Sequence, residues 1–418
     1  MTSKERLQSV LDHKQADKIV IDFGSTPTTG IHVLAVENLR RYYGLEKKPV
    51  KVTEPFQMLG ELEEDLQEVL GVDVIGLSPR NNMFGFTNED WKEFKTFWGQ
   101  TVLVPAKFNT SYDRDGSVLI YPEGNTEVPP SGRMPKLSYF FDAIIRQQPI
   151  DDNALEPNDN LQEFGHISAE DLAYWDQKVT KALKTGKGIV ANFGGTAIGD
   201  IGLVPGTGLV NSKGIRDVAE WYMSILMRRD YVMEVFDKQT DIAVSNLKKI
   251  FNVVGNAVDT VFICGNDFGT QNSQFCSRDD FEEVYAPYYR KMNDWIHANT
   301  KWKTFKHSCG AVEPLIENFI MAGFDILNPV QINAVGMDSR LLKQKYGDRL
   351  VFWGGGVDTQ KVLAFGTPDD VKKQVKEQCK VLGEKGGFVF NTVHNVQANV
   401  PVENLAAMID TLKNINNS

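Results

Sequence analysis

The chain has 418 residues, of which 42% are hydrophobic and 24% charged, so it can build a large core and disorder is not expected. Its net charge is −10 and no block of Lys or Arg occurs, which argues against a nucleic-acid-binding surface. The four cysteines are too few for a disulfide framework and fit a reducing compartment. No N-terminal signal core and no run of about eighteen apolar residues occur. We therefore expect a cytoplasmic protein without a membrane span.

Short apolar runs alternate with helical patterns along most of the chain. Eight runs are strand candidates, at residues 18–24, 71–77, 188–194, 260–265, 304–310, 324–329, 350–356 and 387–391. Strands that alternate with helices predict βαβ units and a parallel sheet, and eight such units favour a closed (β/α)8 TIM barrel. A doubly wound open sheet is the alternative, but no GxGxxG follows the first strand.

Residues 81–135 interrupt this alternation. Aromatic residues and the alternating run 101–105 are separated there by turn residues, a pattern typical of antiparallel hairpins. We expect a β-hairpin insertion after the second strand, within a single domain that spans residues 1–418. Further along the chain, one continuous helical stretch is expected at 215–254.

Polar clusters follow most of the predicted strands. They contain Asp22, Asn192, Asn266 with Asp267, His307 with Cys309, Asn328, Gly354 to Asp358, and Asn391 to His394. In a (β/α)8 barrel the carboxyl ends of the strands meet at one face, where active sites are built. This convergence is the main indication from the residues that the protein is an enzyme.

His307 and Cys309 end the fifth strand candidate. Residues i and i+2 of an extended segment point to the same side, so an imidazole and a thiol face one point. These are zinc-type ligands, and His394 after the eighth strand could complete a three-ligand site with an open fourth position. The alternative is a hydrogen-bonded His, a buried Cys and a surface His.

Two further segments carry candidate functional residues. Asp267 and Gln271 follow the fourth strand, where a carboxylate could act as a base or bind a ligand; the helix N-cap role falls to Ser277 instead. Gly354, Gly355 and Gly356 with Asp358 follow the seventh strand, where glycines permit close approach of a ligand such as phosphate. A tight turn without a ligand explains the same glycines equally well.

Several separated motifs resemble a known family. They are residues 267–271 (DFGTQ), 307–310 (HSCG), 328–331 (NPVQ), 352–360 (FWGGGVDTQ), 393–395 (VHN) and 401–404 (PVEN). In this order they are similar to the uroporphyrinogen decarboxylase superfamily, in particular its cobalamin-dependent methyltransferase branch, which includes methylcobamide:coenzyme M methyltransferases. The likeness covers most of the chain, is strongest after Gly265, and implies a (β/α)8 barrel.

Two departures refine the resemblance. True decarboxylases of the family carry Arg after the first strand and Asp after the second, whereas this chain has no Arg at 24–30 and Ser78-Pro79-Arg80 at the second position. This argues against porphyrinogen decarboxylation. The methyltransferase branch holds zinc with a His-x-Cys pair and a third residue, commonly Cys, after the last strand. Here His307 and Cys309 match, and His394 stands in place of that Cys.

The resemblance implies a zinc-dependent methyltransferase acting on a small O-, S- or N-methylated substrate and a corrinoid (cobalamin). No corrinoid motif of the Asp-x-His-x-x-Gly type occurs, so a separate corrinoid protein is the expected partner. A metal-free decarboxylase or a non-catalytic barrel subunit is the alternative, and a homodimer is left open. For substrate binding we expect strand-end and motif residues, namely Asn192, Asn328, Gln331 and Asn391.

Overall fold

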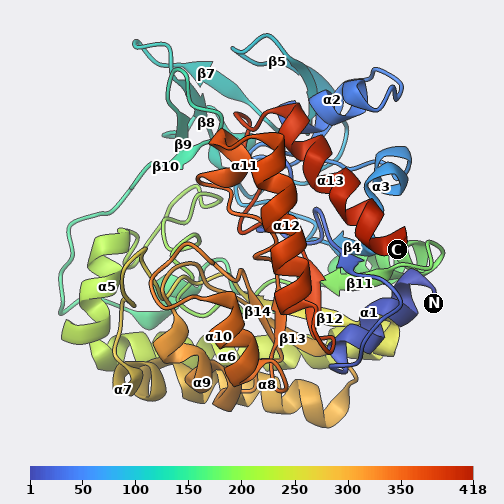
Figure 1. Cartoon of the computed structure of the whole chain (residues 1–418). Helices are drawn as coiled ribbons and strands as arrows, with labels where there is room; N and C mark the ends of the chain where they lie inside the picture. Colours follow the sequence, from blue (N-terminus) through green and yellow to red (C-terminus); the bar gives the residue numbers. More distant parts are fainter. Residues whose placement is uncertain (418) are drawn as a thin grey trace.

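The computed structural model describes residues 1–417. Eight parallel strands form one sheet in the order β1-β16-β15-β14-β13-β12-β11-β4. Their bounds are β1 (Val20–Ile21), β4 (Val74–Leu77), β11 (Gly188–Ala191), β12 (Thr260–Cys264), β13 (Lys303–His307), β14 (Ile326–Asn328), β15 (Val351–Trp353) and β16 (Phe388–Phe390). Each lies within or overlaps one of the eight predicted runs, so the predicted (β/α)8 barrel is confirmed (Figure 1).

The two edges of this sheet, β1 and β4, meet through one residue. The backbone N–H of Asp73 donates to the carbonyl of Ile21 at 2.8 Å, and the Ile21 N–H donates to the Asp73 carboxylate at 3.1 Å. The guanidinium of Arg6 binds the same carboxylate at 2.6 Å, and both side chains are under 10% exposed, at 9% and 8%. A side chain therefore supplies at this seam the hydrogen bond that a longer strand pair would have made between backbones.

Helices alternate with these strands along the chain. They are α2 (Val33–Tyr42), α3 (Glu64–Leu70), α4 (Ala169–Leu183), α5 (Val218–Met227), α6 (Arg229–Val254), α7 (Arg278–Asp280), α8 (Ala286–Asn299), α9 (Glu313–Met321), α10 (Ser339–Tyr346), α11 (Val362–Phe365), α12 (Pro368–Leu382) and α13 (Val402–Asn417), with a π-helical segment at Phe281–Tyr285. Among residues 1–417, no helix combines the length and apolar character that a bilayer crossing requires. The continuous stretch predicted at 215–254 is wrong, because non-helical backbone at Arg228 (φ −128°, ψ 42°) separates α5 from α6.

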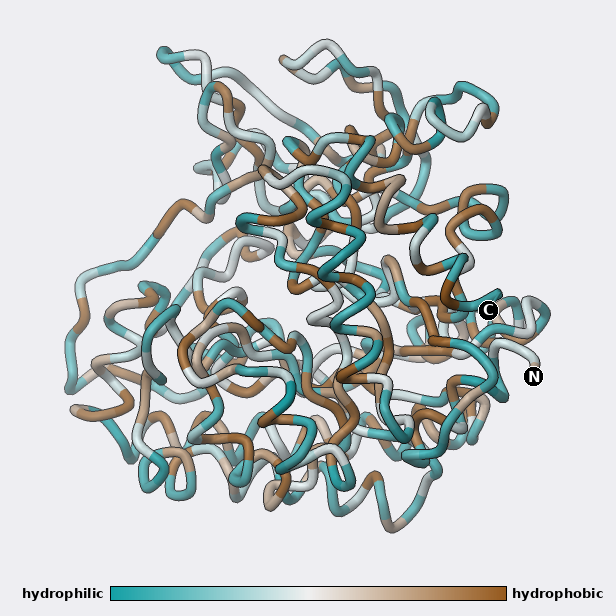
Figure 2. Tube along the Cα trace, viewed as in Figure 1, coloured by the Kyte–Doolittle hydropathy of each residue, from teal (hydrophilic) through white to brown (hydrophobic). Residues whose placement is uncertain are grey.

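The interior of the barrel is packed with side chains. Helix α1 (Ser3–Leu11) closes the N-terminal end of the barrel with Leu7, Val10 and Leu11. These contact inward-facing strand residues, namely Val20, Val74, Val190, Phe262, Phe305, Ile326, Val351, Trp353 and Val389. Figure 2 shows hydrophobic segments running through this interior. With one end filled, the carboxyl ends of the strands are left as the mouth where ligands can bind.

Two smaller sheets stand above the barrel in Figure 1. One contains β2 (Val50–Glu54), β3 (Leu59–Gly60), β5 (Lys92–Lys95) and β6 (Thr101–Val104); the other contains β7 (Thr110–Tyr112), β8 (Val118–Ile120), β9 (Gly132–Met134) and β10 (Asp142–Ala143). Antiparallel hairpins occur within 81–135 as expected. Strand β6 also pairs in parallel with β2, which precedes the second barrel strand, and β10 lies beyond residue 135. The added layer is therefore assembled from more of the chain than the hairpin pattern indicated.

Candidate metal centre

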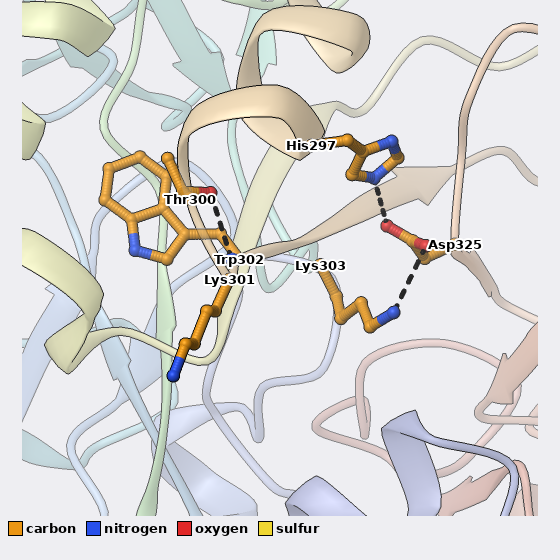
Figure 3. A pocket seen from close by; sticks show the side chains of 6 residues that line it. All are labelled: His297, Thr300, Lys301, Trp302, Lys303 and Asp325. Carbon is orange, nitrogen blue, oxygen red and sulfur yellow. Dashed lines mark hydrogen bonds and ion pairs between the residues drawn. The ribbon is translucent and has the colours of Figure 1, made fainter.

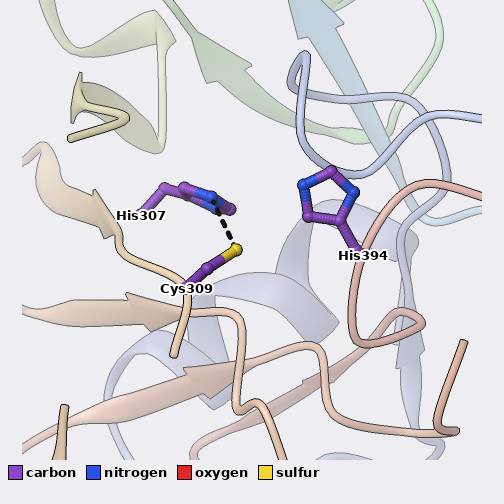
Figure 4. Close-up of side chains that lie close together, drawn as sticks. All are labelled: His307, Cys309 and His394. Atoms are coloured by element: carbon purple, nitrogen blue, oxygen red, sulfur yellow. Dashed lines mark hydrogen bonds between the residues drawn. The ribbon is translucent and has the colours of Figure 1, made fainter. Parts of the chain in front are cut away.

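His307, Cys309 and His394 converge at the mouth of the barrel. His307 ends β13, Cys309 follows two residues later, and His394 lies in the loop after β16. The ligand atoms of the three side chains all lie within 4.8 Å of one another. Figure 4 shows His394 approaching from a separate loop toward His307 and Cys309. The structure thus brings together the three residues that were predicted as metal ligands.

A hydrogen-bonded chain orients the ring of His307. The Nδ2 of Asn328 donates to the carbonyl of Trp353 at 2.8 Å, which turns the amide oxygen of Asn328 toward the imidazole. His307 Nδ1 lies 2.6 Å from that oxygen and so carries the hydrogen, while Nε2 lies 3.4 Å from Cys309 Sγ. The hydroxyl of Thr28 donates to the same Asn328 oxygen at 3.1 Å. The lone pair on His307 Nε2 is therefore directed at the cluster, as metal ligation requires.

Burial sets the protonation of the three ligands. It lowers the pKa of His307, although Asp267 acts in the opposite direction, and it lowers the pKa of His394 to about 4, helped by His307. Burial and the Asp267 carboxylate raise the pKa of Cys309 well above its ordinary value. Both imidazoles are thus neutral and able to ligate. The thiol needs a nearby cation before it ionises, which a bound divalent metal supplies.

The donor set fits zinc. Two imidazole nitrogens and one thiolate are borderline-soft ligands, and three protein ligands leave a fourth position for an exchangeable group. The rings of His307 and His394 stand nearly perpendicular, with centroids 5.9 Å apart and an interplanar angle of 72°. In the part of the chain that the structure describes, neither ring nitrogen of His394 has a hydrogen-bond partner. A ligand that coordinates this ring would satisfy it.

Asp267 lies at the edge of the cluster. Its carboxylate accepts the backbone N–H of Cys309 at 2.6 Å and approaches His307 Nε2 at 3.6 Å. About a third of its side chain, 31%, is exposed, so it faces both the ligands and solvent. The helix that follows is capped by Ser277, whose hydroxyl accepts the N–H of Asp280 at 3.0 Å. The cap role is therefore taken as predicted, and the Asp267 carboxylate is available at the site.

Gln271 and Gln331 brace the loop of Cys309. Gln331 Oε1 accepts the N–H of Gly310 at 2.7 Å, and its amide nitrogen donates to Gln271 Oε1 at 3.1 Å. Gln271 in turn donates to the carbonyl of Asn333. Both side-chain amides are engaged between loops. Their predicted roles in catalysis and substrate binding stay predictions, and the contacts observed are structural.

The glycines after β15 are packed against protein. A Cβ on Gly356 would lie 2.2 Å from Phe390, and Gly354 has a φ of +95°. The carboxylate of Asp358 is buried and accepts from the Asn333 amide at 2.9 Å and the Gln360 N–H at 2.8 Å. A tight turn thus accounts for this segment without a ligand, and cofactor binding by Gly354, Gly355, Gly356 and Asp358 stays a prediction.

The other two predicted substrate residues serve local structure. Asn391 is fully buried, and its amide donates to the carbonyl of Asp22 at 2.7 Å and of Thr29 at 3.2 Å. The side-chain oxygen of Asn192 accepts the N–H of Gly194 at 3.1 Å. Thr28, which donates to the Asn328 oxygen, was not among the predicted site residues. Its position in a polar loop after the first strand was the available signal.

A cavity of about 260 Å³ lies at the opposite end of β13 (Figure 3). It is lined by His297, Thr300, Lys301, Trp302, Lys303 and Asp325. His297 Nε2 binds the Asp325 carboxylate at 2.8 Å, and the N–H of Thr304 donates to the same carboxylate at 2.8 Å. These contacts tie neighbouring elements at the N-terminal face of the barrel, which in this fold serves stability rather than chemistry.

The fold is therefore a (β/α)8 barrel, and the candidate site is a His/Cys/His cluster at its mouth. The family model of uroporphyrinogen decarboxylase (URO-D) matches residues 205–415, and the chain belongs to that family. No curated protein matches it in sequence. A solved methyltransferase from Methanosarcina mazei is similar in structure, with a TM-score of 0.53 at 14% identity over 99% of each chain. That likeness shows the fold.

A second solved structure is more distant. It is endo-glycoceramidase II from a Rhodococcus species, with a TM-score of 0.31 and 11% identity over 56% of this chain and 62% of the other. A score of this size carries no inference about fold or activity. The family match includes the His307–Cys309 segment and His394 but begins after the first three barrel strands.

Proposed function

We propose that this protein is a zinc-dependent methyltransferase that moves a methyl group between a small methylated substrate and a corrinoid carried by a separate protein. The observation that carries the proposal is the convergence of His307, Cys309 and His394 within 4.8 Å at the barrel mouth. Membership of the URO-D family and the shared fold with a methyltransferase support the class of enzyme. The four unpaired cysteines suit a reducing compartment, and we place the enzyme in the cytoplasm.

Each residue of the site has a task in this reaction. When bound, zinc acts as a Lewis acid that makes a substrate thiol or hydroxyl a better nucleophile or leaving group at neutral pH. His307, Cys309 and His394 would hold the metal, and Asn328 keeps the Nε2 lone pair of His307 turned inward. Asp267, partly exposed beside the ligands, is placed to take or return the substrate proton.

The cobalt of the corrinoid accepts or donates the methyl group. The barrel therefore needs only to bind and polarise the substrate. The chain has no Asp-x-His-x-x-Gly motif, and we therefore assign the corrinoid to a partner protein that docks at the mouth. Decarboxylation of a porphyrinogen is disfavoured. The loop 24–30 after β1, which is rich in Thr and Gly, has no Arg to bind carboxylate arms.

Metal analysis followed by a transfer assay tests the proposal. We expect about one zinc per chain, the stoichiometry of a single three-ligand site, lost in the double variant His307→Ala/Cys309→Ala. Cys276→Ala, which removes a half-buried thiol outside the cluster, should keep the metal. Methyl transfer from a panel of methoxy, methylthio and methylamino compounds to cob(I)alamin is then followed by absorbance. Protein that takes up no zinc, or that loads zinc and transfers no methyl group from any donor class, would contradict the proposal.

A further inference from the structure

Lys306 is a fully buried lysine directly next to the metal-ligand candidate His307. Its side chain has 0% exposure and leaves the strand on the outer side of the barrel wall, since its neighbour Phe305 faces the interior. The Nζ lies 4.8 Å from the ring centre of Phe268, 5.7 Å from Phe319 and 5.9 Å from Tyr289. Three aromatic rings thus surround this nitrogen behind the site.

The Nζ of Lys306 also has three acceptors. It donates to the carbonyl of Asn266 at 2.6 Å, to the carbonyl of His307 at 2.7 Å and to the Sγ of Cys264 at 3.7 Å. Three donors matched to three acceptors, inside a cage of aromatic faces, are the coordination of an ammonium. Among residues 1–417 no carboxylate forms an ion pair with it. The charge is therefore stabilised by carbonyl dipoles and rings.

These contacts join the ends of two strands. Asn266 lies two residues past the end of β12 and directly before Asp267, and His307 ends β13 two residues before Cys309. Asp267 in turn accepts the N–H of Cys309 at 2.6 Å. The two segments are therefore joined both beside the metal-ligand cluster and, through Lys306, on the outer side of the barrel wall. Burying a lysine without a carboxylate partner is costly, and an apolar side chain of similar length would fill the same space. The cost indicates that the charge has a use at this position.

We propose that Lys306 is a positioning residue of the metal centre, which locks the segment of Asp267 to that of Cys309 and sets a fixed positive charge behind them. The inference rests on the proposed metal site and goes beyond it. When Cys309 ligates as a thiolate, two negative groups, that thiolate and the Asp267 carboxylate, approach each other. The ammonium offsets their repulsion. Asp200 is another acidic group near Lys306. Its carboxylate accepts the N–H of Gly265, directly after β12, at 2.9 Å.

Cobalt binding tests the contribution of the charge. Lys306→Met removes the charge and the hydrogen bonds, whereas Lys306→Gln removes the charge but keeps an amide NH2 donor on a side chain one bond shorter. We expect Co²⁺ and Zn²⁺ affinities to fall about 10- to 100-fold in both, the range seen when groups that support metal ligands are removed. The thiolate-to-cobalt absorption band should also shift. Lys303→Met, on the same strand but 3.7 Å from Asp325 at the far end, is the control and should bind metal within about twofold of the parent.

Hydrogen exchange of the metal-free protein tests the anchor without any metal. In Lys306→Met the amides of residues 265–269 and 307–311 should exchange faster, while those of β15 and β16 keep their protection. Unchanged exchange and unchanged metal affinity in a folded Lys306→Met or Lys306→Gln variant would overturn the inference. If the parent protein binds no metal, the proposed function and the electrostatic role fail together, and exchange alone decides whether Lys306 anchors the two segments.

Discussion

The imidazole of His307 donates its Nδ1 hydrogen to the side-chain oxygen of Asn328 across 2.6 Å, and this contact defines the chemical state of the candidate metal centre. The Asn328 amide cannot turn over freely, because its nitrogen is held by the carbonyl of Trp353 at 2.8 Å. Strand β15 therefore fixes an amide on β14, and that amide fixes a ring on β13. The orientation of the His307 imidazole at the mouth is therefore set by contacts between three adjacent strands.

Replacing Asn328 should weaken the metal site. Asn328→Ala removes the acceptor of the His307 hydrogen, so the ring can rotate or take the other tautomer. We expect the zinc affinity to fall about 10- to 100-fold. Competition against a chromophoric chelator measures the change, and ¹⁵N spectra of the imidazole report the tautomer directly. Asn192→Ala, at another strand end with only a local contact to Gly194, is the matched control and should retain zinc.

The identity of the third ligand can be tested by replacing His394 with Cys. If His394 ligates the metal, His394→Ala should lose most of the bound zinc, and His394→Cys should retain it because Cys is an equivalent zinc ligand. Metal content after dialysis, and the number of thiolate–cobalt bands in the Co²⁺ form, distinguish the variants. His166→Ala, which removes a His outside the cluster, serves as control. Full zinc retention in His394→Ala would remove this residue from the site.

The sequence predicted those parts of the site that depend on local order. Eight apolar runs gave the barrel, and the positions of His307, Cys309 and His394 after predicted strands placed them at one mouth. Asn328 was predicted to bind substrate, whereas its amide is engaged by His307 and Trp353. Strand order predicts that two loops are neighbours, but not which side chain accepts a particular hydrogen. That depends on rotamers set by packing.

The remaining differences also have a non-local origin. The parallel pairing of β2 with β6 joins residues about fifty positions apart, and neither strand has a pattern that specifies its partner. Lys306 lies inside a predicted strand, but the ring of Phe268 and the carbonyl of Asn266, which contact its ammonium, come from a different segment of the chain. Periodicity identifies elements and the face that each buries. It does not identify the partners of a buried polar group.

The seam of the barrel depends on Asp73, which we expect to be among the most sensitive positions for stability. Its carboxylate binds Arg6, the hydroxyl of Ser3 at 2.6 Å and the N–H of Ile21. Asp73→Ala leaves Arg6 with Asp17 as its remaining carboxylate partner, at 2.7 Å, and leaves the buried N–H of Ile21 without its acceptor. We expect a loss of about 1–3 kcal/mol in the free energy of unfolding. Urea denaturation measures it. Asp12→Ala, whose pair with Lys14 is exposed, should change the free energy by under about 1 kcal/mol.

Asp22 should make stability depend on pH. Its carboxyl is fully buried inside the barrel, where the Trp353 indole donates to it at 2.8 Å and the Ser25 hydroxyl at 2.6 Å. Burial raises its pKa to about 6. The folded protein thus holds this proton at pH values where the unfolded chain, with a pKa of about 3.9, has released it. The group stabilises the fold at low pH, and this contribution is lost as the pH rises through about 4 to 6.

Asp22→Asn removes this titration and keeps an oxygen that can accept from Trp353. The free energy of unfolding of the variant, relative to the parent, should therefore rise between pH 4 and pH 7 by at most about 3 kcal/mol, the equivalent of the raised pKa. Urea denaturation across this range measures it. For Asp348→Asn, at a side chain that is 81% exposed, the free energy of unfolding should change with pH in the same way as in the parent. A constant difference between Asp22→Asn and the parent across the range would mean that Asp22 titrates alike in both states. The indole and hydroxyl contacts would then compensate fully for the burial of the carboxylate.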